Sequence, residues 1–172
     1  MTLPKHRKIR VERYEGGLSE FKTIINPIKL SANESALGPS PKAIKAFEKE
    51  KNKVFRYPNS DSSPLRDIIS EKFSINSNRV ICGAGSDQIF DLTCQLFIEP
   101  GDEVVVTKYG FIMYKIYSSL SRAKIVLAKE KNFKASVEEI IKKVSDKTKI
   151  VFILPQRCIY SIYRYDLYIK KL

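Results

Sequence analysis

Between residues 79 and 153 the sequence alternates short apolar runs with longer helical patterns, and this alternation constrains the fold more than any other feature. The apolar runs are Val80–Cys82, Glu103–Val106, Lys124–Leu127 and Ile150–Ile153. Helical patterns fill the intervals, the first ending near Ile98 and the others covering Phe111–Leu120 and Ser136–Val144. Strands separated by helices predict an α/β protein with a mostly parallel sheet, because each helix carries the chain back to the edge where the next strand starts.

Two serine-proline pairs predict helix starts before this region. Ser40 can cap a first turn through its side-chain oxygen and Pro41 suits the first helical position, so we expect a helix to about Lys51. The pair Ser63–Pro64 repeats the signal ahead of a second apolar series. Residues 1–30 follow no clean period and are expected to form an arm or a partner-contacting segment.

The composition is that of a soluble globular protein. Of 172 residues, 43% are hydrophobic and 29% are charged, which argues against a disordered or fibrous chain. A net charge of +12 would suit nucleic acid, an acidic membrane surface or an anionic metabolite. Because the lysines alternate with carboxylates, as in residues 45–51, we interpret the charge as a solvated surface and expect no nucleic-acid partner. A basic nucleic-acid-binding module is the alternative, and steeply salt-dependent DNA binding would identify it.

Neither a metal site nor a membrane segment is predicted. Cys82, Cys94 and Cys158 are odd in number and lack metal-ligand spacing, and His6 is the single histidine. No apolar stretch has the length of a signal-peptide core or of a transmembrane helix. We therefore expect a cytoplasmic protein.

The segment Val80–Phe90 suits a phosphate group. It has the pattern of a strand, a glycine-bearing turn and a helix start, which directs free backbone N–H groups and the positive end of a helix at one point. The alternative is that Ser86 or Asp87 merely caps the helix. The full glycine pattern of dinucleotide-binding folds is absent, which disfavours such a fold.

Two further stretches could face a ligand or could only connect elements. Leu30–Pro41 places Asn33 and Glu34 among turn-forming residues between two apolar patches. Tyr57 precedes Pro58, which holds the tyrosine in an extended conformation and can direct its hydroxyl at a ligand or at solvent.

These pieces, in this order, resemble the bacterial histidinol-phosphate aminotransferases, which are class II pyridoxal-phosphate-dependent aminotransferases, over roughly residues 14–153. The matching motifs are Tyr14–Ser19, Leu30–Glu34, Leu37–Pro41, Arg56–Pro58, Gly83–Asp87, Glu99–Asp102 and Tyr109–Tyr114. The resemblance implies part of the fold type I large domain of aspartate aminotransferase-like enzymes, with a mostly parallel sheet and an N-terminal arm. It implies an arm and small-domain segment at 1–35, an incomplete cofactor-binding large domain at 36–154 and a tail outside the family pattern at 155–172.

The resemblance also assigns cofactor-binding roles. Backbone amides of Gly85, Ser86 and Asp87 would hold the phosphate of pyridoxal 5'-phosphate, and Phe111 would stack on its ring. Tyr57 would reach the cofactor phosphate of the neighbouring subunit, which implies a homodimer. A phosphate dianion accepts hydrogen bonds from amides and an electron-poor ring packs on an aromatic face, so these roles are physically consistent.

For the substrate side, the resemblance implies that Asn33, with Tyr14 and Glu15 near it, contacts a small molecule. The implied reaction belongs to histidine biosynthesis and converts histidinol phosphate and 2-oxoglutarate to imidazole-acetol phosphate and glutamate. A related aromatic amino-acid aminotransferase is the alternative.

After Ile153 the sequence departs from the family. The family continues with Asn-Pro-x-Asn-Pro-Thr-Gly, whereas this chain continues with Leu154–Cys158. The family's aspartate for the pyridinium nitrogen, its Schiff-base lysine and its arginines have no counterpart before Leu172, so no catalytic residue is assigned. We expect a truncated remnant that is poorly soluble, or inactive, or both, and the resemblance implies the cofactor for the family and not for this chain alone. Residues 155–172 are expected to be a tail such as a frame change creates, with an edge strand or a surface helix as the alternative.

Overall fold

The computed structural model describes Val11, Tyr14, Glu34, Ser35 and residues 37–154. The chain divides into two compact units, one made of residues 1–15 and 84–172 and the other of residues 16–83. Within the described residues, the first unit contains the strands, and the second consists of helices and turns. Each unit is described by itself.

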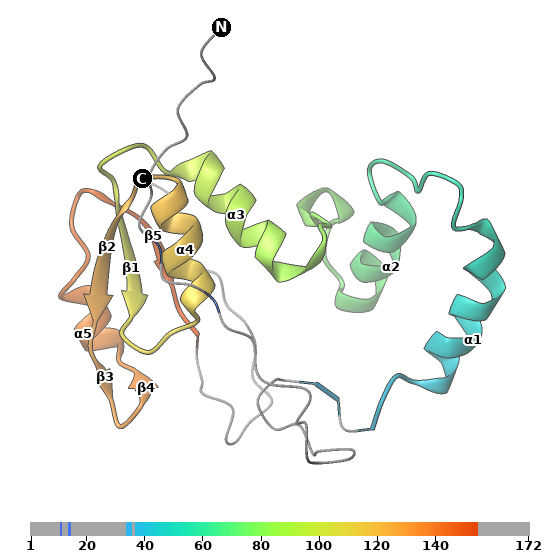
Figure 1. The fold of residues 1–172 in the computed structure, drawn as a ribbon, viewed down its shortest axis with the longest axis horizontal. Coiled ribbons are helices and arrows are strands. Elements are labelled where there is room, and N and C mark those ends of the chain that lie inside the picture. The colour runs from blue at the N-terminus through green and yellow to red at the C-terminus, as the bar shows by residue number, and fades with distance from the viewer. Residues whose placement is uncertain (1–10, 12–13, 15–33, 36, 155–172) are drawn as a thin grey trace, which may run out of the picture. The chain divides into compact units, whose positions relative to one another are not determined.

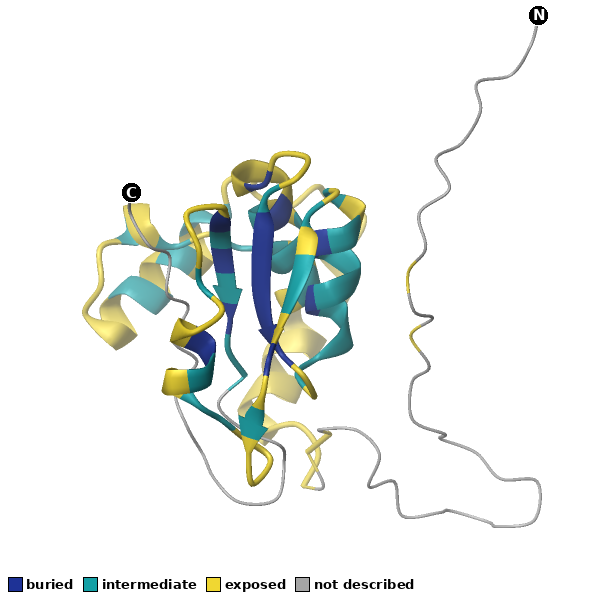
Figure 2. Ribbon diagram, turned by 90° about the vertical axis from the view of Figure 1, so that its left-hand side faces the viewer, coloured by how far each residue is buried: buried dark blue, intermediate teal, exposed yellow. Residues whose placement is uncertain are grey.

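Three parallel strands form the main sheet of the first unit (Figure 1). The middle strand is β1 (Glu103–Thr107), flanked by β2 (Lys124–Ala128) and β5 (Thr148–Phe152). Every residue of β1 is buried, as expected for a central parallel strand, and Figure 2 shows burial concentrated along the middle of the sheet. The α/β fold with a parallel sheet predicted from the sequence is confirmed.

Helices cover both faces of this sheet. They are α3 (Gly85–Phe97), α4 (Ile112–Leu120) and α5 (Val137–Ile141). Side chains alternate along a strand, so Val104 and Val106 of β1 pack with α3 and α4 while Val105 packs against Ile140 of α5. The unit therefore has three layers, with the sheet in the middle.

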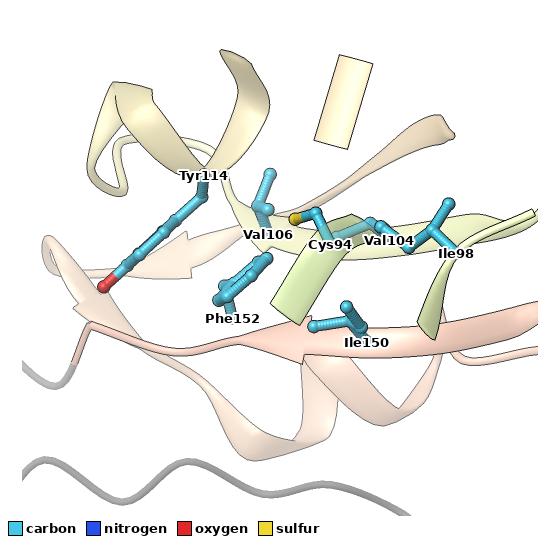
Figure 3. Close-up of a cluster of buried hydrophobic side chains, with 7 residues drawn as sticks. All are labelled: Cys94, Ile98, Val104, Val106, Tyr114, Ile150 and Phe152. Atoms are coloured by element: carbon cyan, nitrogen blue, oxygen red, sulfur yellow. The ribbon is translucent and has the colours of Figure 1, made fainter. Parts of the chain in front are cut away.

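The larger core cluster lies between the sheet and the helices α3 and α4 (Figure 3). The ring of Tyr114 stacks on that of Phe152, with centroids 4.6 Å apart and planes 5° apart. The ring of Phe90 meets both edge-on, with centroids 4.9 Å from Tyr114 and 5.9 Å from Phe152. Each such pair contributes roughly 0.5–1.5 kcal/mol beyond the burial of its surface. This aromatic cluster fixes the start of α4 to the end of β5.

The second unit contains two α-helices and two 3-10 helices among its described residues. They are α1 (Pro41–Glu50), η1 (Lys51–Lys53), α2 (Ser63–Phe73) and η2 (Ser77–Arg79). Both α-helices begin at the predicted serine-proline pairs, and Ser40 caps α1 by accepting the amide of Ala43 at 3.2 Å. Arg66 donates to the carbonyl oxygen of Ser77 from Nε at 3.1 Å and from Nη2 at 2.8 Å, which fixes η2 against α2.

Three segments differ from the sequence-based prediction. The predicted strand Val80–Cys82 is wrong, because these residues pair with none of the described strands and a strand requires a neighbouring backbone to satisfy its hydrogen bonds. An unpredicted antiparallel hairpin follows β2, formed by β3 (Glu130–Lys131) and β4 (Lys134–Ala135). The predicted helix at 136–144 is shorter than expected, since α5 ends at Ile141 and continues only as a turn.

No helix among the described residues is long and apolar enough to cross a membrane. The segment 155–172 lies outside the described residues. What the sequence implies about that tail, and about domain bounds at 1–35 and 36–154, therefore stays a prediction.

Candidate functional site

The central strand β1 ends in a tight turn that requires glycine. The amide of Gly110 donates to the carbonyl oxygen of Thr107 at 3.0 Å. A Cβ at Gly110 would lie 2.8 Å from Oγ1 of Thr107 and 3.2 Å from its carbonyl oxygen, closer than ordinary contacts. The residue after this turn is Phe111, which occupies the N-cap position of α4 at the carboxyl end of β1. Ligands of α/β sheets bind at this end of the strands.

The ring of Phe111 is half-buried and rests on the core. Its centroid lies 5.7 Å from that of Tyr114, with the planes at 89°, and Tyr114 in turn stacks on Phe152. Tyr14, from the N-terminal segment, meets Phe111 edge-on with centroids 6.4 Å apart and planes at 83°. Two residues that the sequence assigned to one site, Tyr14 and Phe111, are thus brought together.

The first turn of α3 presents backbone amides that no side chain caps. Ala84 occupies the N-cap position without a side-chain hydrogen bond, so neither Ser86 nor Asp87 acts as the N-cap. The amide of Ala84 itself donates to Oε1 of Gln88 at 2.6 Å. Gly85 has φ +79°, and a Cβ there would meet no atom within 4 Å, so glycine is needed for the backbone conformation and the space beside it is open. The amides of the first helical turn lack intrahelical acceptors, which suits an anion.

The amides of α3 and the ring of Phe111 lie at the same end of the sheet. Both α3, which precedes β1, and α4, which follows it, run roughly opposite to that strand, so that each begins on the side of the sheet toward which β1 points (Figure 1). The two helices also contact each other. This arrangement places a helix end with uncapped amides and an aromatic surface at one edge of the first unit.

Negative charge on α3 affects the neighbouring helix. The pKa of Tyr117 on α4 is raised, mainly because its hydroxyl is partly buried. The nearby carboxylates of Asp87 and Asp91 raise it further. Asp87 is therefore close enough to α4 for its carboxylate to act there, and Tyr117 stays a neutral phenol. Burial also raises the pKa of Cys94, whose Sγ lies 3.8 Å from Oγ of Ser118, so this thiol is a core residue and not a nucleophile.

The β3–β4 hairpin also contacts this end of the sheet, and sequence reasoning did not foresee it. Oε1 of Glu130 accepts the amide of Tyr109 at 3.2 Å. The rings of Phe133 and Tyr109 lie with centroids 6.0 Å apart. The hairpin turns at Asn132 and Phe133, with φ 51° and 59°, where such turns usually carry glycine. Asn132 was the only local signal for it.

The remaining predicted site residues are not brought to this edge by anything the structure describes. Tyr57 belongs to the second unit and its side chain is fully exposed. Asn33 and Glu15 lie outside the described residues. Among the residues that the structure describes, no cluster of histidine, cysteine, aspartate or glutamate could hold a metal ion.

Comparison with known proteins points to one family. A profile for aminotransferase class I and II matches residues 25–154. A histidinol-phosphate aminotransferase of Pelagibacter ubique is 52% identical over 153 residues, which are 89% of this chain and 42% of that relative. A histidinol-phosphate aminotransferase of Dinoroseobacter shibae is 42% identical over 140 residues, covering 81% of this chain and 39% of the relative. The chain thus spans less than half the length of these curated relatives.

A solved structure shares the fold. It is the histidinol-phosphate aminotransferase of Sinorhizobium meliloti in complex with pyridoxal-5'-phosphate, with a TM-score of 0.68 and 19% identity over 71% of this chain and 33% of that one. An aspartate aminotransferase of Thermotoga maritima aligns with a TM-score of 0.58 and 22% identity. Both likenesses concern the fold alone, and they confirm that the chain has part of the fold type I architecture.

Proposed function

This chain belongs to the class I and II aminotransferases, and on that basis we propose that it provides the pyridoxal-phosphate-binding part of a histidinol-phosphate aminotransferase. The names of the relatives support the substrate assignment. In the whole enzyme, the amino group of histidinol phosphate passes to 2-oxoglutarate, giving imidazole-acetol phosphate and glutamate. A homodimer in the cytoplasm is part of the same proposal.

The observation that carries this proposal is the pairing of the uncapped first turn of α3 with Phe111 at one sheet end. The amides of Gly85, Ser86 and Asp87 hold the dianionic phosphate, and the open space beside Gly85 leaves room for it. Phe111, which contacts Tyr114 edge-on, would offer its ring to the cofactor's pyridine ring. The residues present therefore fit the cofactor at both its phosphate and its ring.

When bound, pyridoxal phosphate supplies the electron sink on which amino-group transfer depends. This chain's residues bind and orient it. By the family resemblance Tyr14, which contacts Phe111, would contact the substrate, and Asn33 would have the same role. Tyr57, with its exposed side chain, reaches the cofactor phosphate of the neighbouring subunit.

No lysine in these 172 residues stands in the context of the family's covalent lysine. We infer that the 172-residue chain by itself does not turn over substrate. Incubation with pyridoxal phosphate, histidinol phosphate and 2-oxoglutarate should give no glutamate, and borohydride should fix no cofactor to a single lysine. Detection of glutamate together with cofactor fixed to a single lysine would contradict this inference.

A chimera tests the activity of the whole enzyme. The 153 aligned residues of the Pelagibacter ubique relative are replaced by those of this chain, and turnover is measured with histidinol phosphate and with phenylalanine as amino donors. Preference for histidinol phosphate is expected. Preference for phenylalanine would favour the aromatic aminotransferase alternative. A folded chimera that uses neither donor would contradict the proposed function.

A further inference from the structure

The turn that presents Phe111 is supported from outside its own strand and helix. The amide of Tyr109, two residues before Phe111, donates to Oε1 of Glu130 at 3.2 Å. The ring of Phe133, from the same hairpin as Glu130, lies 6.0 Å from the ring of Tyr109. Two independent contacts therefore connect the hairpin to the segment that carries Phe111.

The hairpin is itself held in place. Nζ of Lys131 lies 2.6 Å from Oε2 of Glu138 on α5, and Nζ of Lys142 lies 2.8 Å from Oε1 of the same carboxylate. The amide of Lys108 donates to the carbonyl oxygen of Ala128 at 2.9 Å, which joins the chain after β1 to the end of β2. The Lys131–Glu138 ion pair thus connects the hairpin to α5.

The other carboxylate oxygen of Glu130, Oε2, is buried without a hydrogen-bond donor among the described residues. A buried oxygen without a donor destabilises the folded state. Glu130 therefore combines one oxygen that accepts the amide of Tyr109 with a second, buried oxygen that has no donor among the described residues.

We propose that Glu130 is a positioning residue that fixes the Tyr109–Phe111 segment and thereby presents the Phe111 ring to the pyridine ring of the cofactor. The cofactor part of this inference rests on the proposed function, whereas the part that Glu130 fixes the Tyr109–Phe111 segment does not. Glu130 acts through Tyr109 and contacts no reacting atom.

Amide hydrogen exchange of the 172-residue chain tests the hydrogen bond from Tyr109 to Glu130 without any ligand. In Glu130→Ala the amide of Tyr109 loses its acceptor, and its exchange should become about tenfold faster, the size expected for one hydrogen bond to a charged group. Glu130→Gln keeps an acceptor oxygen and should restore slow exchange. The control is Glu139→Ala, which removes a carboxylate of α5 that binds Lys142, and it should leave Tyr109 unchanged. Equal exchange in wild type and Glu130→Ala would overturn the proposal.

A comparison of two ligands tests whether Glu130 supports cofactor binding by positioning Phe111. Inorganic phosphate probes only the α3 amides, whereas pyridoxal phosphate also requires Phe111. Glu130→Ala should weaken the binding of pyridoxal phosphate about three- to tenfold and leave that of inorganic phosphate unchanged. An equal loss for both ligands, or for neither, would contradict the positioning role.

The outcomes separate the two proposals. If wild type binds neither ligand, the proposed function fails, and the exchange experiment still decides whether Glu130 holds the turn. If Glu130→Ala does not fold, Glu130→Asp takes its place, because it keeps the charge and withdraws the acceptor by one methylene. Slow exchange at Tyr109 in a folded Glu130→Asp would then count against the proposal.

Discussion

Glu103 and Lys124, the first residues of two neighbouring parallel strands, are joined by a hydrogen bond of 2.8 Å between Oε1 and Nζ. The other carboxylate oxygen of Glu103 accepts Oγ of Ser145, before β5, at 2.7 Å. One side chain thus connects β1 with β2 and with the segment that precedes β5, at the end of the sheet opposite to Phe111. The hydrogen bonds from Lys124 and then from Ser145 lower the pKa of Glu103 below its ordinary value of 4.5.

This shift predicts an acid-dependent loss of stability. A carboxyl group whose pKa is lowered by folding stabilises the folded state above its ordinary pKa, and the contribution disappears as the pH falls from about 4.5 through the lowered value. Urea unfolding at about pH 7 and about pH 3 should therefore show a smaller pH dependence in Glu103→Gln than in wild type. Glu48→Gln, on the exposed surface of α1, is the control and should match wild type. An unchanged pH dependence in Glu103→Gln would show that the link contributes nothing.

The aromatic cluster predicts a large effect of truncating Phe152. This side chain is buried, stacks on Tyr114 and meets Phe90 edge-on. Phe152→Ala should lower the free energy of unfolding by about 3–5 kcal/mol, because it leaves a cavity in the core. Ile141→Ala, at a position where the side chain is mostly exposed, should change it by less than about 0.5 kcal/mol. Urea denaturation measures both, and similar losses would mean that the cluster is not the centre of the core.

The turn before Phe111 predicts a clash that a second substitution relieves. In Gly110→Ala the new Cβ approaches Oγ1 and the carbonyl oxygen of Thr107, so we expect a loss of about 1–3 kcal/mol in the free energy of unfolding. The double variant Thr107→Ala/Gly110→Ala removes the nearer atom and should regain part of that loss. A double-mutant cycle by thermal denaturation tests this coupling. Strictly additive losses would indicate that the contact with Oγ1 is not the cause.

Local signals explain what could be predicted from the sequence. Ser40 followed by Pro41 marks the start of α1, and the amide that Ser40 binds lies three residues away. The run Val104–Val106 is apolar on both faces, which already indicates a central strand of a parallel sheet. In such cases the interactions that determine the element lie within the segment itself.

Pairing between distant segments explains what could not be predicted. The apolar run Val80–Cys82 has the composition of a strand but no described strand beside it. In the hairpin at 130–135, Glu130 and Phe133 contact Tyr109, which is distant in the sequence. The meeting of Tyr14 with Phe111 likewise has no signature in spacing. Only the family resemblance placed these two residues in one site.

The phosphate site predicts different outcomes at two glycines of similar backbone geometry. Gly85 and Gly38 have φ +79° and +68°, and a Cβ at either would meet no atom within 4 Å. Substitution by alanine therefore strains the backbone at each by about 1–2 kcal/mol without a steric clash. Only Gly85 lies in the first turn of α3, so Gly85→Ala should disturb the amides that bind phosphate, whereas Gly38→Ala should not. Calorimetric titration with pyridoxal phosphate should show at least about tenfold weaker binding for Gly85→Ala and wild-type binding for Gly38→Ala. Equal affinities in the two variants would place the phosphate elsewhere.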